Sequence, residues 1–170
     1  TLNAASQLAV IEDAETTSLF IQNIADIFRY NLKSLDELVP LSDELEFVSN
    51  YMSILKMRFG ERIAYEYNID KDSLGIKIPR ITLQPIIENA YIHGLQNLER
   101  NGTIRLETKV QNEVLLISIE DDGMGMTKEQ VDNLINEDNA EETAIENSNK
   151  HLSGIGVSNV IKRLKLSFQV

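Results

Sequence analysis

The chain has 170 residues, of which 42% are hydrophobic and 25% charged, with no cysteine and a net charge of −11. This composition is typical of a soluble globular domain, and without cysteine it excludes disulfides and thiolate metal sites. The acidic balance argues against nucleic-acid binding because an acidic surface repels phosphate backbones, and no apolar run approaches the roughly 20 residues of a membrane span.

The first 34 residues are expected to be helical, with a bend in the acidic, β-branched stretch at residues 11–17. Apolar residues at roughly heptad spacing predict a face that packs against other helices. These residues are Phe20, Ile24, Ile27, Phe28 and Leu32. Two interpretations remain open: a core helix, or a dimerising arm separated from the rest by LDELVPL.

A second helix is predicted over residues 42–59. Pro40 ends the preceding segment, and Ser42 is the predicted N-cap, with Glu44 in the first turn. Gly60 suits a left-handed C-terminal cap. The apolar face comprises Leu45, Val48, Met52 and Leu55.

Three strands are predicted from period-two alternation, at residues 63–69, 103–110 and 113–120, the last two around a turn at Gln111–Asn112. Residues 127–153 are acidic and contain few apolar residues, which predicts a mobile loop of the kind that forms lids. A last helix is expected at about 157–166. With a further helix at 81–94, this order predicts helices on one face of a mixed sheet.

The helix at 81–94 carries polar residues inside an apolar run, and they are not randomly placed. One face is apolar and comprises Leu83, Ile86, Ile87, Ala90 and Gly94. Glu88 and Asn89 fall on its flanks, and His93 follows Asn89 by one turn. Taken alone, this pattern is typical of a solvated helix face, and the alternative is the rim of a site.

The stretch EDDGMGM, at residues 120–126, follows a predicted strand. Gly123 and Gly125 permit unusual backbone conformations and close approach of a ligand, while a carboxylate here can accept a hydrogen bond from the amino group of a base. A plain acidic turn is the alternative, and the spacing does not fit an EF-hand.

The stretch SGIGV, at residues 153–157, opens the last helix. Glycines at a helix N-terminus expose backbone N–H groups to an anion such as phosphate, although a simple glycine-flanked turn is the alternative. The stretch is neither a Walker A loop nor GxGxxG, because residue 159 is Asn.

In this order the motifs resemble the GHKL ATP-binding fold of sensor histidine kinases, specifically the LytS/YesM type. LQPIIENAYIHG resembles the N box, EDDGMGM the first glycine box and GIGVSNVIKRL the second. FRYNLKS and ELVPLSDELEFVSNYMSILKMRFGERI resemble the linker and first helix of that family. The resemblance implies an α+β fold, a two-layer α/β sandwich with helices on one face of a mixed sheet, preceded by a helical arm.

The resemblance also implies two regions. Residues 1–39 would be the remnant of a dimerisation and histidine phosphotransfer region. Residues 40–170 would be an ATP-binding kinase domain, truncated at its C-terminus, with residues 127–153 as the ATP lid.

Roles for single residues follow from the same resemblance. Asn89 would coordinate Mg²⁺ between the ATP phosphates, Glu88 would orient the attacking histidine or accept its proton, and Asp121 would accept the adenine amino group. The other residues expected at ATP are His93, Gly123, Gly125, Met126, Gly154, Ile155, Gly156 and Val157. Ile92 stands where many relatives carry Lys, so one phosphate-facing cation is missing.

The function implied is transfer of the γ-phosphoryl group of Mg-ATP to a histidine located before residue 1, and from there to an aspartate of a response regulator. On this expectation the chain binds ATP but does not phosphorylate itself, because His93 and His151 are its only histidines and neither matches the acceptor motif. The parent protein would be a homodimer through the helical arm and a membrane-anchored sensor, of which this is a cytoplasmic part that touches neither membrane nor nucleic acid. The alternatives are another GHKL ATPase, such as an anti-sigma-type serine kinase, and a non-catalytic dimerisation scaffold.

Overall fold

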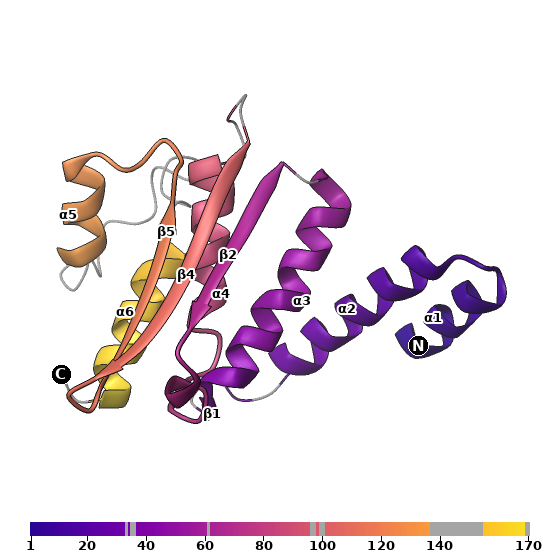
Figure 1. Ribbon diagram of the computed structural model, residues 1–170, viewed down its shortest axis with the longest axis horizontal. Helices are drawn as coiled ribbons and strands as arrows, with labels where there is room; N and C mark the ends of the chain where they lie inside the picture. The colour runs from indigo at the N-terminus through magenta and orange to yellow at the C-terminus, as the bar shows by residue number, and fades with distance from the viewer. Residues whose placement is uncertain are drawn as a thin grey trace, which may run out of the picture.

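The computed structural model describes residues 1–32, 34, 37–60, 62–95, 98, 101–136 and 155–168. Figure 1 shows an N-terminal pair of helices, α1 (Leu2–Ile11) and α2 (Glu15–Asn31), projecting from a domain built on a sheet. The predicted bend is confirmed as a short turn in which Asp13 has φ 54°. The two helices meet through small residues, with the Ser6 and Ser18 hydroxyls 2.9 Å apart.

The apolar face predicted for this segment is only partly covered. Phe28 is 58% exposed and Leu32 is 84% exposed. Leu32 follows Phe28 by four residues, so the two side chains lie on the same side of the helical segment. The expectation of packing against other helices is therefore not met for these two residues within one copy of the described chain.

Helix α3 (Leu41–Phe59) begins one residue before the predicted start, and its N-cap is Pro40 rather than Ser42. The reason is a two-stranded ladder of β1 (Leu38–Pro40) with β3 (Lys77–Pro79), neither of which the sequence indicated. Next to it, Leu41 N donates to Ile76 O at 2.8 Å and Ser42 N to Leu74 O at 3.1 Å. Backbone carbonyls thus satisfy the first turn, and no side-chain cap is needed.

The main sheet has the order β2-β4-β5 and is mixed, as predicted. Strand β2 (Ile63–Ile69) runs parallel to β4 (Gly102–Gln111), and β4 runs antiparallel to β5 (Val114–Asp121). A short 3-10 helix, η1 (Lys71–Ser73), follows β2. The β4–β5 turn lies at Asn112–Glu113, one residue later than predicted, with φ of 51° and 64°, the combination that a type I′ hairpin requires.

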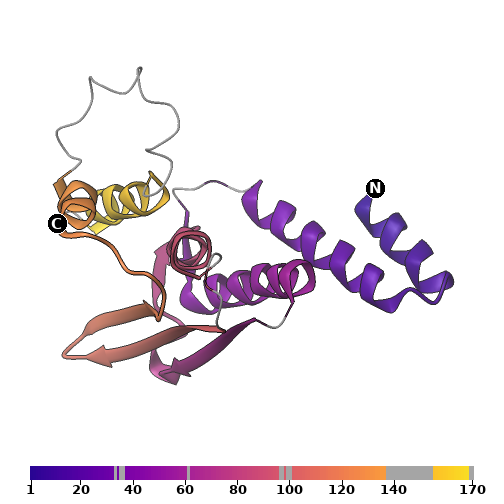
Figure 2. The ribbon, with the colours of Figure 1, turned by 90° about the horizontal axis from the view of Figure 1, so that it is seen from above.

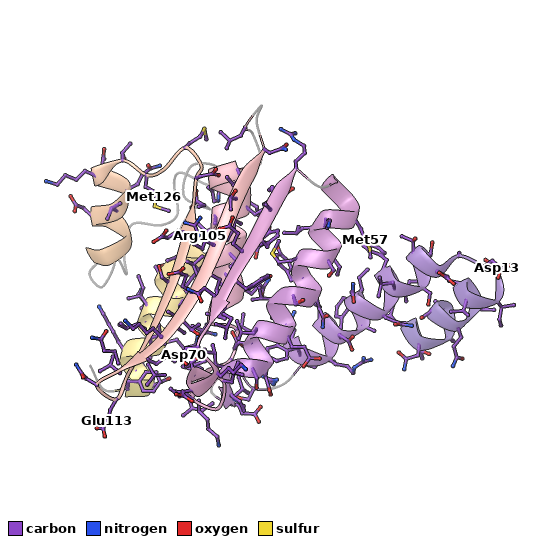
Figure 3. All side chains as sticks on the ribbon, viewed as in Figure 1. Asp13, Met57, Asp70, Arg105, Glu113 and Met126 are labelled. Atoms are coloured by element: carbon purple, nitrogen blue, oxygen red, sulfur yellow. The ribbon has the colours of Figure 1, made fainter. Side chains whose placement is uncertain are left out.

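Three helices cover one face of this sheet, which confirms the predicted layers: α3, α4 (Leu83–Asn89) and α6 (Ile155–Phe168), as Figure 2 shows. Leu83, Ile87 and Ile104 are each 1% exposed in the core between helices and sheet. The opposite face is charged, and Figure 3 labels Arg105 there, whose guanidinium lies 2.8 Å from the Glu66 carboxylate. One face is therefore buried and the other solvated, as is common for antiparallel and mixed sheets.

The single helix predicted at 81–94 is divided in two. Helix α4 continues into η2 (Ala90–Leu95), which is π-helical. The core face is as predicted, since Leu83, Ile87, Ala90 and Gly94 are buried. A π-helical turn within a helix is frequently found at a functional site.

The prediction of a loop from residue 127 onward is wrong for its first part, because α5 (Lys128–Asn136) is a helix. Its start is a reciprocal capping box: Thr127 N donates to Gln130 Oε1 at 2.7 Å, and Gln130 N donates to Thr127 Oγ1 at 3.3 Å. Residues 137–153, the remainder of the expected lid, lie outside the described residues. Among the described helices, none is both long enough and apolar enough to cross a membrane.

Candidate functional site

A pocket of about 190 Å³ lies between α4, η2 and the start of α6. Five of the residues predicted for the site meet here: Glu88, Asn89, His93, Gly156 and Val157. Pro85 and Ile92 complete the lining. The polar rim of the helix at 81–94 therefore faces the second glycine stretch, which favours the site over the solvated-face interpretation.

Helix α4 places Glu88 and Asn89 on this rim, because its opposite face is anchored in the core. Both are half-buried. The Glu88 carboxylate accepts a hydrogen bond from Gln84 Nε2 at 3.3 Å and interacts with the Tyr51 hydroxyl of α3. Burial, together with the neighbouring Glu88 carboxylate, raises the pKa of Tyr51 above its usual value. The Tyr51 hydroxyl therefore stays protonated at neutral pH, next to the Glu88 carboxylate.

The start of α6 is held very close to α4. A Cβ atom added at Gly156 would lie 3.3 Å from Pro85 Cβ, which is tighter than ordinary van der Waals contact. The residue at 156 therefore has to be small for the two helices to meet at the pocket. Gly154 lies outside the described residues, and Ile155 is the first residue of α6.

The end of β5 is joined to η2 by a second close contact. A Cβ at Gly94 would lie 2.5 Å from Asp121 Oδ1, and a Cβ at Gly123 would lie 2.4 Å from Gly94 O. Met124 N donates to Gly94 O at 3.2 Å, and Gly123 N donates to Asp121 Oδ1 at 2.9 Å. The carboxylate of Asp121 is thereby fixed against η2, immediately after His93.

The rest of the first glycine stretch has other surroundings. Gly125 has φ 69°, which favours glycine, and a Cβ there would meet nothing within 4 Å. Met126 is 45% exposed and leads toward α5 (Figure 3). Neither they nor Asp121 and Gly123 line the 190 Å³ pocket. The predicted site residues thus form two neighbouring groups, one at α4 and α6 and one at the end of β5, joined through η2.

Sequence reasoning missed three residues of this site. Tyr51 and Pro85 were assigned no role, and Gly94 was interpreted as part of the apolar face of its helix. The sequence signal for Gly94 was its place at the end of IHG, but only the fold shows that Asp121 lies against it.

Asn89 is the metal ligand that the resemblance implies, and it lines the 190 Å³ pocket. Within the described part of the chain, no group of three or more His, Asp or Glu side chains could hold a metal ion. The Asn89 side chain offers a neutral oxygen. Gly156, which also lines the pocket, presents backbone there and not a side chain.

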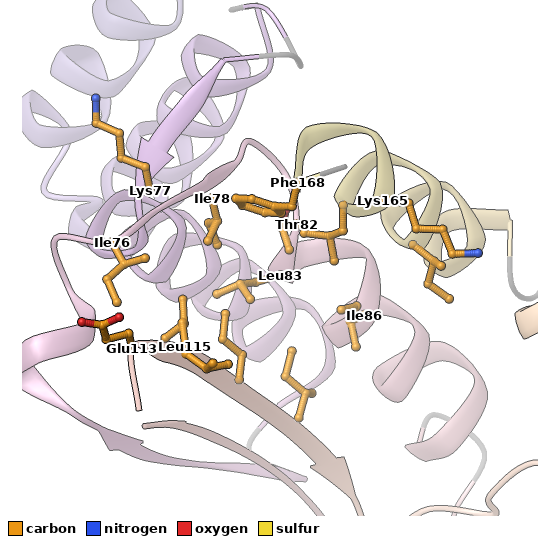
Figure 4. A pocket seen from close by; sticks show the side chains of 15 residues that line it. Ile76, Lys77, Ile78, Thr82, Leu83, Ile86, Glu113, Leu115, Lys165 and Phe168 are labelled. Atoms are coloured by element: carbon orange, nitrogen blue, oxygen red, sulfur yellow. The ribbon is translucent and has the colours of Figure 1, made fainter. Parts of the chain in front are cut away.

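A larger cavity of about 860 Å³ lies elsewhere, between β5, β3, α4 and α6 (Figure 4). Its walls are mainly aliphatic and include Leu115, Ile86 and Phe168. None of the predicted site residues lines it. Its size alone does not make it the site, because it lacks the convergent polar groups that recognise a nucleotide.

Comparison with known proteins assigns the family. Residues 77–169 match the family described as histidine kinase-, DNA gyrase B-, and HSP90-like ATPase, and residues 1–63 match the histidine kinase family. The chain belongs to the histidine kinase-, DNA gyrase B- and HSP90-like ATPases, and the GHKL fold predicted from the sequence is confirmed. ATP is the ligand that membership implies.

Individual relatives are sensor proteins, and two of the three described here are named as sensor histidine kinases. Sensor histidine kinase BtsS of Escherichia coli (strain K12) is 37% identical over 64% of this chain and 19% of its own length. Sensor histidine kinase YesM of Bacillus subtilis (strain 168) is 30% identical over 74% of this chain and 22% of its own. Sensor protein LytS of Oceanobacillus iheyensis is 33% identical over 89% and 25%. The chain therefore spans at most a quarter of the length of these three proteins.

Proposed function

We propose that the chain is the catalytic ATP-binding core of a two-component sensor histidine kinase. The observation that carries this proposal is the single pocket in which Glu88, Asn89 and His93 of one segment meet Gly156 and Val157 of another. The similarity to BtsS, YesM and LytS supports a kinase over other members of the ATPase family.

In this proposal each residue binds or orients. Asp121, held by the Gly123 amide, accepts a hydrogen bond from the amino group of adenine. The N–H groups at the start of α6 face the phosphates, where the helix dipole favours negative charge. Gly125, Met126, Gly154, Ile155 and Val157 complete the nucleotide site, and His93 lies at the phosphates in place of the cation that Ile92 does not supply.

Asn89 would hold Mg²⁺ together with the phosphates, and bound Mg-ATP would supply an electrophilic phosphorus with metal stabilisation of the developing charge. Glu88 accepts the proton that the imidazole of the acceptor histidine loses as its nitrogen bonds to the γ-phosphorus, while the bond from that phosphorus to the bridging oxygen breaks and ADP leaves with the electron pair. Tyr51 and Gln84 keep the Glu88 carboxylate in one orientation for that task. The acceptor in this proposal is a histidine other than His93, which lines the same pocket as Glu88 and Asn89 and is assigned to the nucleotide.

The partners in this proposal are a second copy, bound through the helical region of residues 1–39, and a response regulator whose aspartate receives the phosphoryl group. The domain at 40–170, with its lid at 127–153, belongs to the cytoplasmic part of a membrane-anchored sensor. The exposed Phe28 and Leu32 support the dimer, since a second copy would cover them.

Thermal unfolding with and without Mg-ATP tests nucleotide binding. A ligand at about 100 times its Kd stabilises the native state by about 2.7 kcal/mol, which raises Tm by roughly 5–10 °C for a chain of this size. Asp121→Asn should remove the shift. Asp122→Asn is the matched control, because the Asp122 carboxylate accepts from Thr103 N at 2.8 Å and belongs to the sheet; it should lower Tm but keep the shift.

Thermal unfolding, together with the acid stability of the label on a phosphorylated partner, separates the proposal from its alternatives. A non-catalytic scaffold gives no shift with millimolar Mg-ATP. A serine kinase gives the shift, but its phosphorylated partner retains label in acid, whereas phosphohistidine loses it. A shift that survives Asp121→Asn would contradict the assignment of the adenine site.

A further inference from the structure

Glu44, on α3, is completely buried, and its carboxylate is used by another helix. It accepts hydrogen bonds from Ile81 N at 2.7 Å, Thr82 N at 2.7 Å and Leu83 N at 3.1 Å. These are the N–H groups at the start of α4, which have no partner within that helix. A carboxylate of α3 therefore fixes the start of the helix that carries Glu88 and Asn89.

The same carboxylate accepts the hydroxyl of Tyr30, on α2. The Tyr30 ring stacks on the Phe47 ring of α3, with the two ring centroids 4.3 Å apart. The guanidinium of Arg80, which precedes α4 in the chain, lies over the Tyr30 ring, 3.9 Å from its centroid. Arg80 itself is 2% exposed. Burial, followed by the hydrogen bond to Glu44, raises the pKa of Tyr30, so its hydroxyl remains a donor at neutral pH. Helix α2 is thus bonded to the carboxylate that holds α4.

The segment that Glu44 holds has an unfavourable backbone conformation. Ile81 has φ 55°, which is rare for a β-branched residue. Its carbonyl accepts from Arg163 Nη2 of α6 at 2.5 Å. A conformation of this kind persists only where its surroundings fix it, and here α3 holds the N–H groups while α6 holds the carbonyl.

A second contact from α3 reaches the other end of α4. Tyr51 lies seven residues after Glu44, two helical turns on the same side of α3, and interacts with Glu88. Helix α3 therefore contacts α4 through polar groups at two places: Glu44 at the start of α4, and Tyr51 at Glu88.

We infer that Glu44 is a positioning residue that sets α4, and with it Glu88 and Asn89, and that the Tyr30 hydroxyl makes this setting depend on the placement of α2. The joint between α2, α3 and α4 consists of Tyr30, Glu44 and the backbone N–H groups of residues 81–83. The consequence for nucleotide binding rests on the proposed function, whereas the joint does not. Neither Glu44 nor Tyr30 lines the nucleotide pocket, so their effect on the site passes through the helices that they hold.

The test uses Glu44→Gln and Tyr30→Phe in the 170-residue chain. Glu46→Gln on the exposed side of α3 and Tyr67→Phe on β2 are the matched controls. Gln has one carbonyl oxygen for three N–H groups, so amide hydrogen exchange at Ile81 and Thr82 should accelerate about tenfold or more. Tyr30→Phe keeps the stacked ring and removes only the hydroxyl, so it should give a smaller acceleration, about threefold. It also keeps the test informative if Glu44→Gln does not fold.

Two readouts separate positioning from general stability. The side-chain amide resonance of Asn89 should shift in both variants and in neither control, and the Kd for Mg-ATP should rise about tenfold in Glu44→Gln. Unchanged exchange at 81–83 in Tyr30→Phe would overturn the joint. Faster amide exchange at residues 81–83 without a shift of the Asn89 side-chain resonance would contradict the inference that Glu44 positions Asn89. A wild-type chain that does not bind Mg-ATP would refute the proposed function, while the exchange arm would still decide the joint.

Discussion

At the scale of single residues, the site depends on glycines, because a side chain at these positions would not fit. Gly94 and Gly123 are in contact through backbone, and a methyl group on either would overlap Asp121 or the Gly94 carbonyl. Asp121 and Asp122 are adjacent carboxylates with different tasks, because Asp121 bonds the turn at Gly123 and Asp122 bonds Thr103 of β4. Neither distinction follows from residue type.

Gly94→Ala should therefore impair the site and the fold together. Its Cβ would lie 2.5 Å from Asp121 Oδ1, and overpacking of this kind typically costs about 1–3 kcal/mol. The Asp121 carboxylate should be displaced and the Tm shift with Mg-ATP should fall strongly. Gly75→Ala, where a Cβ would meet nothing within 4 Å, is the control and should leave both unfolding and the shift intact. An unaffected shift in Gly94→Ala would show that Asp121 is not held as described.

Buried tyrosines predict a loss of stability in alkaline solution. Burial raises the pKa of Tyr65 above its usual value, and within the described structure its buried hydroxyl has no hydrogen-bond partner. A raised folded-state pKa favours the protonated form, so the stabilisation is complete below about pH 10, where the unfolded tyrosine titrates, and is lost as pH rises above it.

Urea unfolding of wild type and Tyr65→Phe from pH 8 to pH 11 measures this effect. Tyr65→Phe should be no less stable at pH 8, because it removes an unpaired buried hydroxyl, and it should lose less stability by pH 11. Parallel pH curves for the two chains would contradict the prediction, since lysines titrate equally in both.

At the scale of elements, helix starts are decided by what lies nearby in space. Ser42 looks like the cap of α3, but the carbonyls of Leu74 and Ile76 already accept the first N–H groups. Helix α5 is capped instead by the local pair Thr127 and Gln130.

Substitution of the two candidate caps should separate these cases. Thr127→Ala should cost α5 about 0.5–2 kcal/mol, seen as faster amide exchange from Lys128 onward. Ser42→Ala should change stability by less than about 0.5 kcal/mol, because Ser42 makes no cap bond in α3. A larger effect at Ser42 than at Thr127 would reverse the interpretation.

The sequence predicted what periodicity and local chemistry determine. The three strands of the main sheet, the helix over residues 42–59, the core face of α4 and the meeting of Asn89 with Gly156 could all be predicted, because apolar spacing and motif order define them. It did not predict β1 and β3, whose three-residue pairing is set by distant chain segments. Nor did it predict the task of Glu44, since a glutamate in a first turn looks like a partner of its own helix dipole.

At the scale of the whole molecule, the two faces of the main sheet differ, since one is covered and the other is exposed to solvent. Helices cover one face of the sheet, the other face carries ion pairs such as Arg105 with Glu66, and the α1–α2 pair extends beyond both (Figure 1). The exposed apolar residues of α2 belong to this extension. We expect them to be covered by a second copy, as proposed above.

The double variant Phe28→Ser/Leu32→Ser should weaken self-association. Each apolar side chain buried on association contributes about 1.5–3 kcal/mol, so the dimer Kd should rise by at least about tenfold in sedimentation equilibrium. Leu166→Ser, at an 81% exposed position on α6, is the control and should leave the Kd unchanged. Equal association of both variants would place the interface elsewhere.

The main-chain contact between Gly94 and Gly123 also has a consequence for variation in this site. Side chains that separate two walls adjust their rotamers, so the gap between such walls varies with their identity. Here carbonyl oxygen and α-carbon meet directly, and the spacing between η2 and the end of β5 is fixed by the polypeptide itself. Substitutions at neighbouring positions will alter what the walls present to a ligand while their separation stays constant.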